Sequence, residues 1–161
     1  MRMLAFGCLA LFVAMSAPAG ACQLADHSGA IRLKLPVEGR ITSRFGMRRH
    51  PILGYTKMHT GTDWAAEFGA PVRASARGEV TSAGMAGEYG NRIVVRHGSD
   101  LETAYAHLSR IDVKEGDCIE QGITIGAVGA TGLSTGPKLH FEVLRSGRFV
   151  DPLAVIGESS Q

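Results

Sequence analysis

The sequence predicts an all-β fold, arranged as one compact domain. Three observations carry this prediction. Short runs rich in Val, Ile, Tyr and Thr, the residue types that favour strands, recur along the chain. Glycines separate these runs and supply the turns between them. No window sustains the 3.6-residue apolar period that a helix of ordinary length would show.

The first 21 residues have the layout of a secretory leader. Arg2 supplies the positive start, an apolar stretch follows, and Ala19-Gly20-Ala21 offers a small-residue cleavage site. The apolar stretch is too short and too interrupted for a transmembrane helix. We therefore expect an exported protein, located in the periplasm, the cell envelope or outside the cell, whose mature chain begins at Cys22.

Removal of the leader leaves two cysteines, Cys22 and Cys118. An oxidising compartment permits a disulfide between them. The alternative is a lipid on Cys22, which would attach the protein to a membrane, because "AGAC" loosely matches a bacterial lipoprotein processing site. Ala19 stands where such sites prefer Leu, which counts against the lipid. Neither cysteine has C-x-x-C spacing, which argues against a thiolate metal site.

The remaining chain divides into a lead-in, a domain and a tail. Residues 22–36 show little periodic signal and form the lead-in, the domain spans residues 37–155, and the tail is residues 156–161. The strand-like runs of the domain are, in chain order, "GEVTSAG" (78–84), "NRIVVRHG" (91–98), "ETAYAHL" (102–108), "ITIGAVG" (123–129) and "KLHFEVL" (138–144).

The charge balance excludes one class of partner. The formal net charge is +2 for the whole chain and +1 once Arg2 has left with the leader. A net charge this small is not the strongly positive charge that is typical of a nucleic-acid-binding domain. One local basic cluster is expected to be a solvated loop face, although it would also suit a polyanionic cell-envelope polymer. It consists of Arg40, Arg44, Arg48, Arg49 and Lys57.

The run "GPKLHFEV" (136–143) alternates apolar and polar residues. Because successive side chains of a strand point to opposite faces, one face carries Leu139, Phe141 and Val143 and belongs to the core. The other face carries Lys138, His140 and Glu142. His140 is therefore aimed away from the core, either as an ordinary surface histidine or as a ligand.

The run "HTGTD" places His59 and Asp63 four residues apart. Two threonines and a glycine make a poor helical turn, but in an extended or bulged strand the two side chains share a face. One imidazole and one carboxylate form half of a zinc site, and a catalytic zinc site usually has three protein ligands. His140 is the candidate for the third.

Five blocks of the chain resemble the lysostaphin/LytM-type zinc metallopeptidases over roughly residues 37–153, in that family's order. The resemblance implies an antiparallel β-sheet or sandwich with a narrow groove, one Zn²⁺ ion, and hydrolysis of peptide bonds in bacterial peptidoglycan. The blocks are "GMRRHPILGYTKMHTGTDWAAEFGAPVRASARGEV", "YGNRIVVRHG", "TAYAHLS", "VKEGDCIEQGITIGAVGATGLSTGPKLHFEV" and "VDPL".

The resemblance also implies roles for individual residues. The metal ligands would be His59, Asp63 and His140. His107 of "YAH" would face the reacting water and exchange a proton with it without binding the metal.

Three further residues are expected to line the substrate groove. Tyr105 lies two residues before His107 and, by strand alternation, shares its face. Tyr89 and Asn91 are expected to line the same groove.

Lys138 departs from the family pattern, which has histidine as the first residue of H-x-H at this place. A deprotonated Lys138 would act as a base, whereas a protonated one would stabilise the oxyanion and leave the proton chemistry to His107. The alternative is a catalytically impaired, zinc-bearing module that binds or regulates the cell wall. We favour a working but altered peptidase, because all three ligands and His107 are present.

Overall fold

The structure, a computed structural model, describes residues 22, 31–49, 52 and 54–156. The predicted leader (1–21) lies outside these residues, as does the predicted tail beyond Ile156. Strands dominate, and helical structure within the described ranges consists of the 3-10 turn η1 (Gly87–Tyr89) and the short helix α1 (Pro152–Ile156). The prediction of an all-β fold is confirmed. Among these residues, no helix is long and apolar enough to cross a membrane.

The described residues form thirteen strands. They are β1 (Arg40–Ser43), β2 (Gly46–Arg49), β3 (Thr56–His59), β4 (Thr62–Ala65), β5 (Pro71–Arg73), β6 (Gly78–Met85), β7 (Asn91–Arg96), β8 (Leu101–Leu108), β9 (Arg110–Ile111), β10 (Cys118–Ile119), β11 (Thr124–Ala127), β12 (Lys138–Arg145) and β13 (Arg148–Val150). Their pairings are antiparallel throughout.

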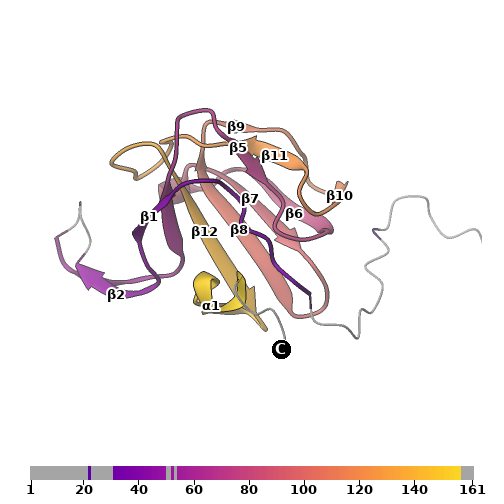
Figure 1. Ribbon diagram of the computed structural model, residues 1–161, viewed down its shortest axis with the longest axis horizontal. Coiled ribbons are helices and arrows are strands. Elements are labelled where there is room, and N and C mark those ends of the chain that lie inside the picture. The colour runs from indigo at the N-terminus through magenta and orange to yellow at the C-terminus, as the bar shows by residue number, and fades with distance from the viewer. Residues whose placement is uncertain (1–21, 23–30, 50–51, 53, 157–161) are drawn as a thin grey trace, which may run out of the picture.

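Three sheets result from these pairings (Figure 1). The largest has eight strands in the order β1-β4-β12-β8-β7-β6-β10, with β13 paired to β12. A three-stranded sheet has the order β5-β11-β9, and β2 pairs with β3. Figure 1 shows the β2 segment extending away from the body of the large sheet, on the side of β1. Arg48 of β2 and Lys57 and Met58 of β3 line a cleft, so the β2–β3 pair forms one of its walls.

The core is built from side chains of both the eight-stranded and the three-stranded sheets. β12 contributes Leu139, Phe141 and Val143, which are fully buried, as its alternation predicts. Val72 of β5 and Ile125 of β11 join the cluster from the smaller sheet. Burying a side chain of this size contributes about 1.5–3 kcal/mol. These contacts hold β12 firmly in place.

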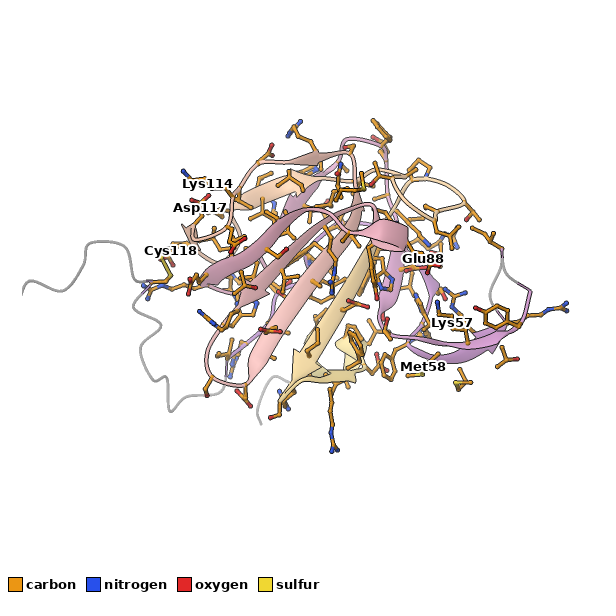
Figure 2. The ribbon with its side chains drawn as sticks, turned by 180° about the vertical axis from the view of Figure 1, so that it is seen from behind. Lys57, Met58, Glu88, Lys114, Asp117 and Cys118 are labelled. Atoms are coloured by element: carbon orange, nitrogen blue, oxygen red, sulfur yellow. A yellow bond between two sulfur atoms is a disulfide. The ribbon has the colours of Figure 1, made fainter. Side chains whose placement is uncertain are left out.

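The described part of the predicted lead-in packs against the domain. Leu33 is buried in the core, and the Lys34 amide donates to the Ser75 carbonyl at 2.8 Å. Cys22 forms a disulfide with Cys118, the first residue of β10 (Figure 2). Of the two alternatives for Cys22, the structure therefore contains the disulfide.

The position of β12 between β4 and β8 determines what lies beside His140. In the register of these strands, Asp63 of β4 pairs with His140 from one side, and Ala106 of β8 pairs with it from the other. Ala104 occupies the matching place opposite Glu142. The small alanines leave space for the imidazole and the carboxylate on this face of the sheet.

Gly61 connects β3 to β4 where the chain passes close to β12. A Cβ atom on Gly61 would collide with the Phe141 carbonyl oxygen and would lie 2.9 Å from His140 Cε1. The close approach brings the end of β3 next to His140. Only glycine fits this place without a shift of the backbone.

We expect Gly61→Ala to destabilise the fold by about 1–3 kcal/mol, because the added methyl group meets the Phe141 carbonyl oxygen and the side chains of His140 and Glu142. Thermal or denaturant unfolding measures this change. Gly84→Ala is the matched control, since a Cβ at Gly84 of β6 meets nothing within 4 Å. Equal stability of the two variants would contradict the described packing at Gly61.

Candidate metal centre

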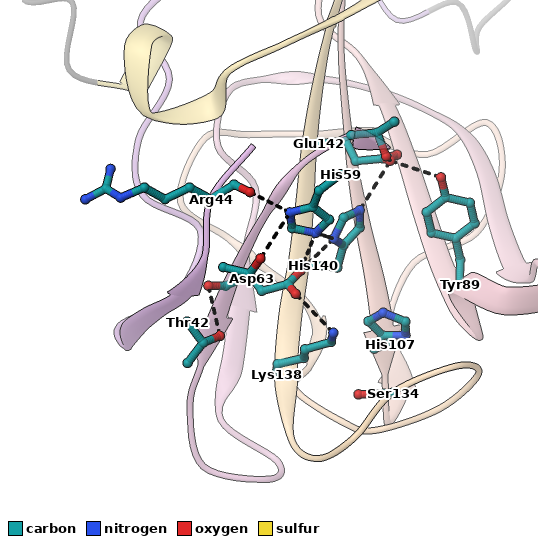
Figure 3. A network of polar contacts seen from close by, with 12 residues as sticks. Thr42, Arg44, His59, Asp63, Tyr89, His107, Ser134, Lys138, His140 and Glu142 are labelled. Carbon is teal, nitrogen blue, oxygen red and sulfur yellow. Dashed lines mark hydrogen bonds and ion pairs between the residues drawn. The ribbon is translucent and has the colours of Figure 1, made fainter. Parts of the chain in front are cut away.

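His59, Asp63 and His140 converge on one point (Figure 3). One ligand-type atom from each lies within 4.8 Å of the others, and all three residues are buried. His59 Nε2 is 3.1 Å from Asp63 Oδ1 and 3.2 Å from His140 Nδ1. His140 Nδ1 is 2.7 Å from the same Asp63 oxygen. Two imidazoles and a carboxylate in such a triangle form a donor set suited to a divalent metal ion such as zinc.

The outer nitrogen of each imidazole has a hydrogen-bond acceptor. His59 Nδ1 donates to the Arg44 carbonyl at 2.8 Å, which leaves Nε2 directed into the triangle. His140 Nε2 donates to Glu142 Oε1 at 3.2 Å, which leaves Nδ1 directed into the triangle, where it shares a hydrogen with Asp63 Oδ1. Such outer partners select the tautomer and hold the ring of a metal ligand in position. The residues present therefore fit a metal ion.

Asp63 is held as a carboxylate. Burial raises the pKa of Asp63, but hydrogen bonds with His140 and His59 and the charge of Lys138 outweigh it and hold that pKa well below its usual range. Oδ1 faces the two imidazoles, whereas Oδ2 lies 3.1 Å from Lys138 Nζ and 3.9 Å from an Arg48 Nη2 atom. The two oxygens of Asp63 thus have separate partners.

Glu142 is the site residue that sequence reasoning missed, because its only signal was a shared strand face with His140. Its carboxylate is fully buried. Oε1 accepts hydrogen bonds from Thr60 Oγ1 at 2.5 Å and Tyr89 OH at 3.0 Å, and Oε2 accepts one from Arg92 at 2.9 Å. Burial raises the pKa of Glu142, but the hydrogen bond with His140 and its charge outweigh burial and lower that pKa. Glu142 is a fixed anion behind His140.

His107 faces the same space from β8. Its Nδ1 donates to the Thr131 carbonyl at 2.8 Å, and its ring centroid is 5.9 Å from that of His140. Burial lowers the pKa of His107 to about 4, so the imidazole is neutral at pH 7. Because Nδ1 carries the hydrogen, Nε2 is left as an acceptor. The structure thus places His107 beside the triangle and outside it.

Tyr105 does not line the groove, contrary to the prediction. It is fully buried, its ring lies 5.2 Å from that of Phe141, and its hydroxyl accepts a hydrogen bond from the Ser75 amide. The prediction assumed that strand alternation continues to His107. His107 has a positive φ of 61°, a left-handed conformation, which interrupts the alternation there. Tyr105 therefore lies on the core face although His107 lies in the groove.

Of the other two predicted groove residues, one lines the cleft and one supports it. Tyr89 lines the cleft next to His140. Asn91 is absent from the described lining; its Nδ2 donates to the Leu108 carbonyl and its amide donates to Thr131 Oγ1. These hydrogen bonds connect Asn91, the first residue of β7, to the end of β8 and to the loop that contains Thr131.

The cleft in front of the triangle has a volume of about 240 Å³. Lys57 of β3 and Glu88 of η1 approach each other to 3.5 Å across it, and Figure 2 shows both residues between the β2–β3 pair and the large sheet. Its lining is Arg48, Lys57, Met58, His59, Thr60, Glu88, Tyr89, His107, Leu133, Lys138 and His140.

Residues 57–152 match the sequence profile of peptidase family M23. The chain belongs to this family. The DD-carboxypeptidase/endopeptidase Mpg of Neisseria meningitidis serogroup B is 47% identical over 130 residues, which cover 81% of this chain and 30% of that protein. The M23 chain described here thus spans less than a third of that relative.

Solved structures share the fold as well. A zinc-containing peptidase from Vibrio cholerae superposes with a TM-score of 0.72 at 39% identity, covering 82% of this chain and 41% of that one. The catalytic domain of lysostaphin from Staphylococcus simulans superposes with a TM-score of 0.68 at 31% identity, covering 73% and 92%. The predicted lysostaphin-like architecture of this M23 chain is confirmed.

We expect Glu142→Gln to weaken zinc binding by about 10- to 100-fold, the usual effect of losing an outer-shell carboxylate. Competition with a chromophoric chelator measures the affinity. Glu79→Gln is the matched control, because Glu79 also pairs with an arginine, Arg96 at 2.7 Å, on the strands β6 and β7. An unchanged affinity in Glu142→Gln would contradict the role of Glu142 in positioning His140.

Proposed function

We propose that this M23 chain is an exported zinc metallopeptidase that hydrolyses peptide bonds in bacterial peptidoglycan. One observation carries the proposal: the His59–Asp63–His140 triangle, with both outer nitrogens anchored, opens onto a cleft that also contains His107. Relatives support the substrate class, since one is a DD-carboxypeptidase/endopeptidase and one a peptidoglycan DD-endopeptidase. A zinc-containing structural neighbour supports the choice of metal.

His59, Asp63 and His140 would hold the zinc ion, as the family resemblance implies. When bound, zinc polarises a carbonyl and lowers the pKa of water to about 7. His107, neutral and with Nε2 free to accept, is placed to take a proton from water in the cleft and to return it to the leaving amine. The cleft walls would orient the peptide.

Lys138 would stabilise negative charge and leave proton transfer to His107. Its Nζ donates to Asp63 Oδ2 at 3.1 Å. An ammonium group has three donors and no acceptor, so in this ion pair Lys138 has no lone pair with which to take a proton. The ion pair thus favours the oxyanion-stabilising role over that of a base.

The second candidate is a zinc-bearing module that binds or regulates the cell wall without cleaving it. The observation that favours it is Lys138 itself, which replaces the family's catalytic histidine and forms an ion pair with Asp63. In this case the triangle would serve binding alone.

Export is supported by the disulfide between Cys22 and Cys118, because such bonds persist in oxidising compartments. The disulfide engages the sulfur that a lipid would need. We therefore propose a periplasmic, envelope or extracellular location without a lipid on Cys22.

We expect the zinc-loaded protein to release muropeptides from purified peptidoglycan sacculi. His107→Ala should slow release by about 100-fold or more, the range attributed to general acid–base catalysis, while zinc content stays the same. Chromatography with mass analysis measures the products, and metal analysis measures the zinc. Lys138→His tests the second candidate: a protein that binds zinc, releases nothing, and gains hydrolysis only with histidine at position 138 is a binding module.

A further inference from the structure

The cleft carries two cations that share one carboxylate oxygen. Arg48 Nη2 lies 3.9 Å and Lys138 Nζ 3.1 Å from Asp63 Oδ2, and both residues line the cleft. Two other cations nearby have carboxylates of their own: Lys57 pairs with Glu88, and Arg92 pairs with Glu142. Asp63 also offers Oδ1 to the candidate metal centre. Positive charge beside the triangle therefore exceeds the negative charge available to it.

Arg48 has donors that no described residue uses. Its Nε atom is buried and has no hydrogen-bond partner, and at 3.9 Å its Nη2 contact with Asp63 is an ion pair that is too long for a hydrogen bond. Along β2, Met47 and Arg49 are exposed, whereas Arg48 is half-buried and turned into the cleft. A guanidinium presents a planar fork of donors that matches the two oxygens of a carboxylate. A partly buried guanidinium that lines this cleft and has donors that no described residue accepts points to an anionic ligand.

We propose that Arg48 and Lys138 form a carboxylate-binding site beside the metal centre. The site takes the free α-carboxylate of the residue that contributes the nitrogen of the scissile bond. This inference rests on the proposed peptidase function and defines its substrate class. In a peptide, that carboxylate carbon is only two bonds from the scissile nitrogen, so it lies within a few ångströms of the reacting carbonyl. Arg48 and Lys138, which both approach Asp63 Oδ2, are at the right place to meet it.

The site distinguishes two kinds of bond in cell-wall peptides. A bond before a C-terminal residue, or one at a branch where the amine donor keeps a free α-carboxylate, satisfies both cations. A bond inside an uninterrupted chain, such as one within a glycine bridge, presents a neutral amide there and leaves the guanidinium unpaired. Sites built around a charged hydrogen bond reject ligands that lack it, because the buried donors stay unsatisfied. The cleft therefore selects carboxylate-bearing substrates.

The test compares two stem peptides that end in D-alanyl-D-alanine, one with a free carboxylate and one with a terminal carboxamide. With the zinc-loaded protein, we expect kcat/KM for the carboxylate peptide to exceed that for the carboxamide by about 10- to 100-fold. Arg48→Gln should reduce this ratio to near one, and Arg48→Lys should keep an intermediate ratio. Arg49→Gln is the matched control, because Arg49 is exposed on the same strand and donates to the Gly54 carbonyl.

Calorimetric binding of the same two peptides separates this proposal from the proposed function. If both peptides resist hydrolysis but the carboxylate form binds more tightly and Arg48→Gln removes that difference, the carboxylate site stands and the peptidase function fails. If hydrolysis proceeds and the two peptides are equivalent, the peptidase function stands and the carboxylate site is overturned. A preference that persists in Arg48→Gln, or the absence of binding by either peptide, likewise overturns the carboxylate site.

Discussion

The imidazole of His140 lies between two buried carboxylates, with Asp63 Oδ1 2.7 Å from Nδ1 and Glu142 Oε1 3.2 Å from Nε2. The Glu142 contact selects the tautomer, and the Asp63 contact marks where a cation would replace the shared hydrogen. His59 closes the triangle and is held in turn by the Arg44 carbonyl. The remaining features of the site, including the cleft and its cations, are arranged around this contact.

One strand joins the core to the site, and its pattern is the part of the molecule that sequence predicts best. Leu139 and Phe141 are buried as alternation requires, so His140 must face the other way. A slip of β12 by one residue would turn His140 into the core, so packing maintains the site. The pairing of Asp63 with His140 joins residues far apart in the chain. The residue pattern made His140 a candidate third ligand, and the family resemblance assigned it that role.

Three features of the site could not be predicted from the sequence, because they depend on an unusual backbone conformation or on contacts between distant segments. Tyr105 was assigned to the groove face although it lies on the core face, because the left-handed conformation of His107 interrupts the alternation of the strand. A histidine at position 107 does not by itself reveal a positive φ. Glu142 looked like any polar residue on a strand, since the donors that bury and hold it come from other segments, with Arg92 on β7. The unused hydrogen-bond donors of the Arg48 guanidinium likewise become visible only when the β2–β3 pair is placed beside the cleft.

Anomalous diffraction at the zinc edge, from crystals of the zinc-loaded protein, tests the central claim most directly. We predict one peak, about 2.0–2.2 Å from His59 Nε2, Asp63 Oδ1 and His140 Nδ1, the usual zinc distances for these donors. Glu142 should remain hydrogen-bonded to His140 behind the metal. A peak held through His59 Nδ1 or His140 Nε2, or one located away from this triangle, would contradict the account.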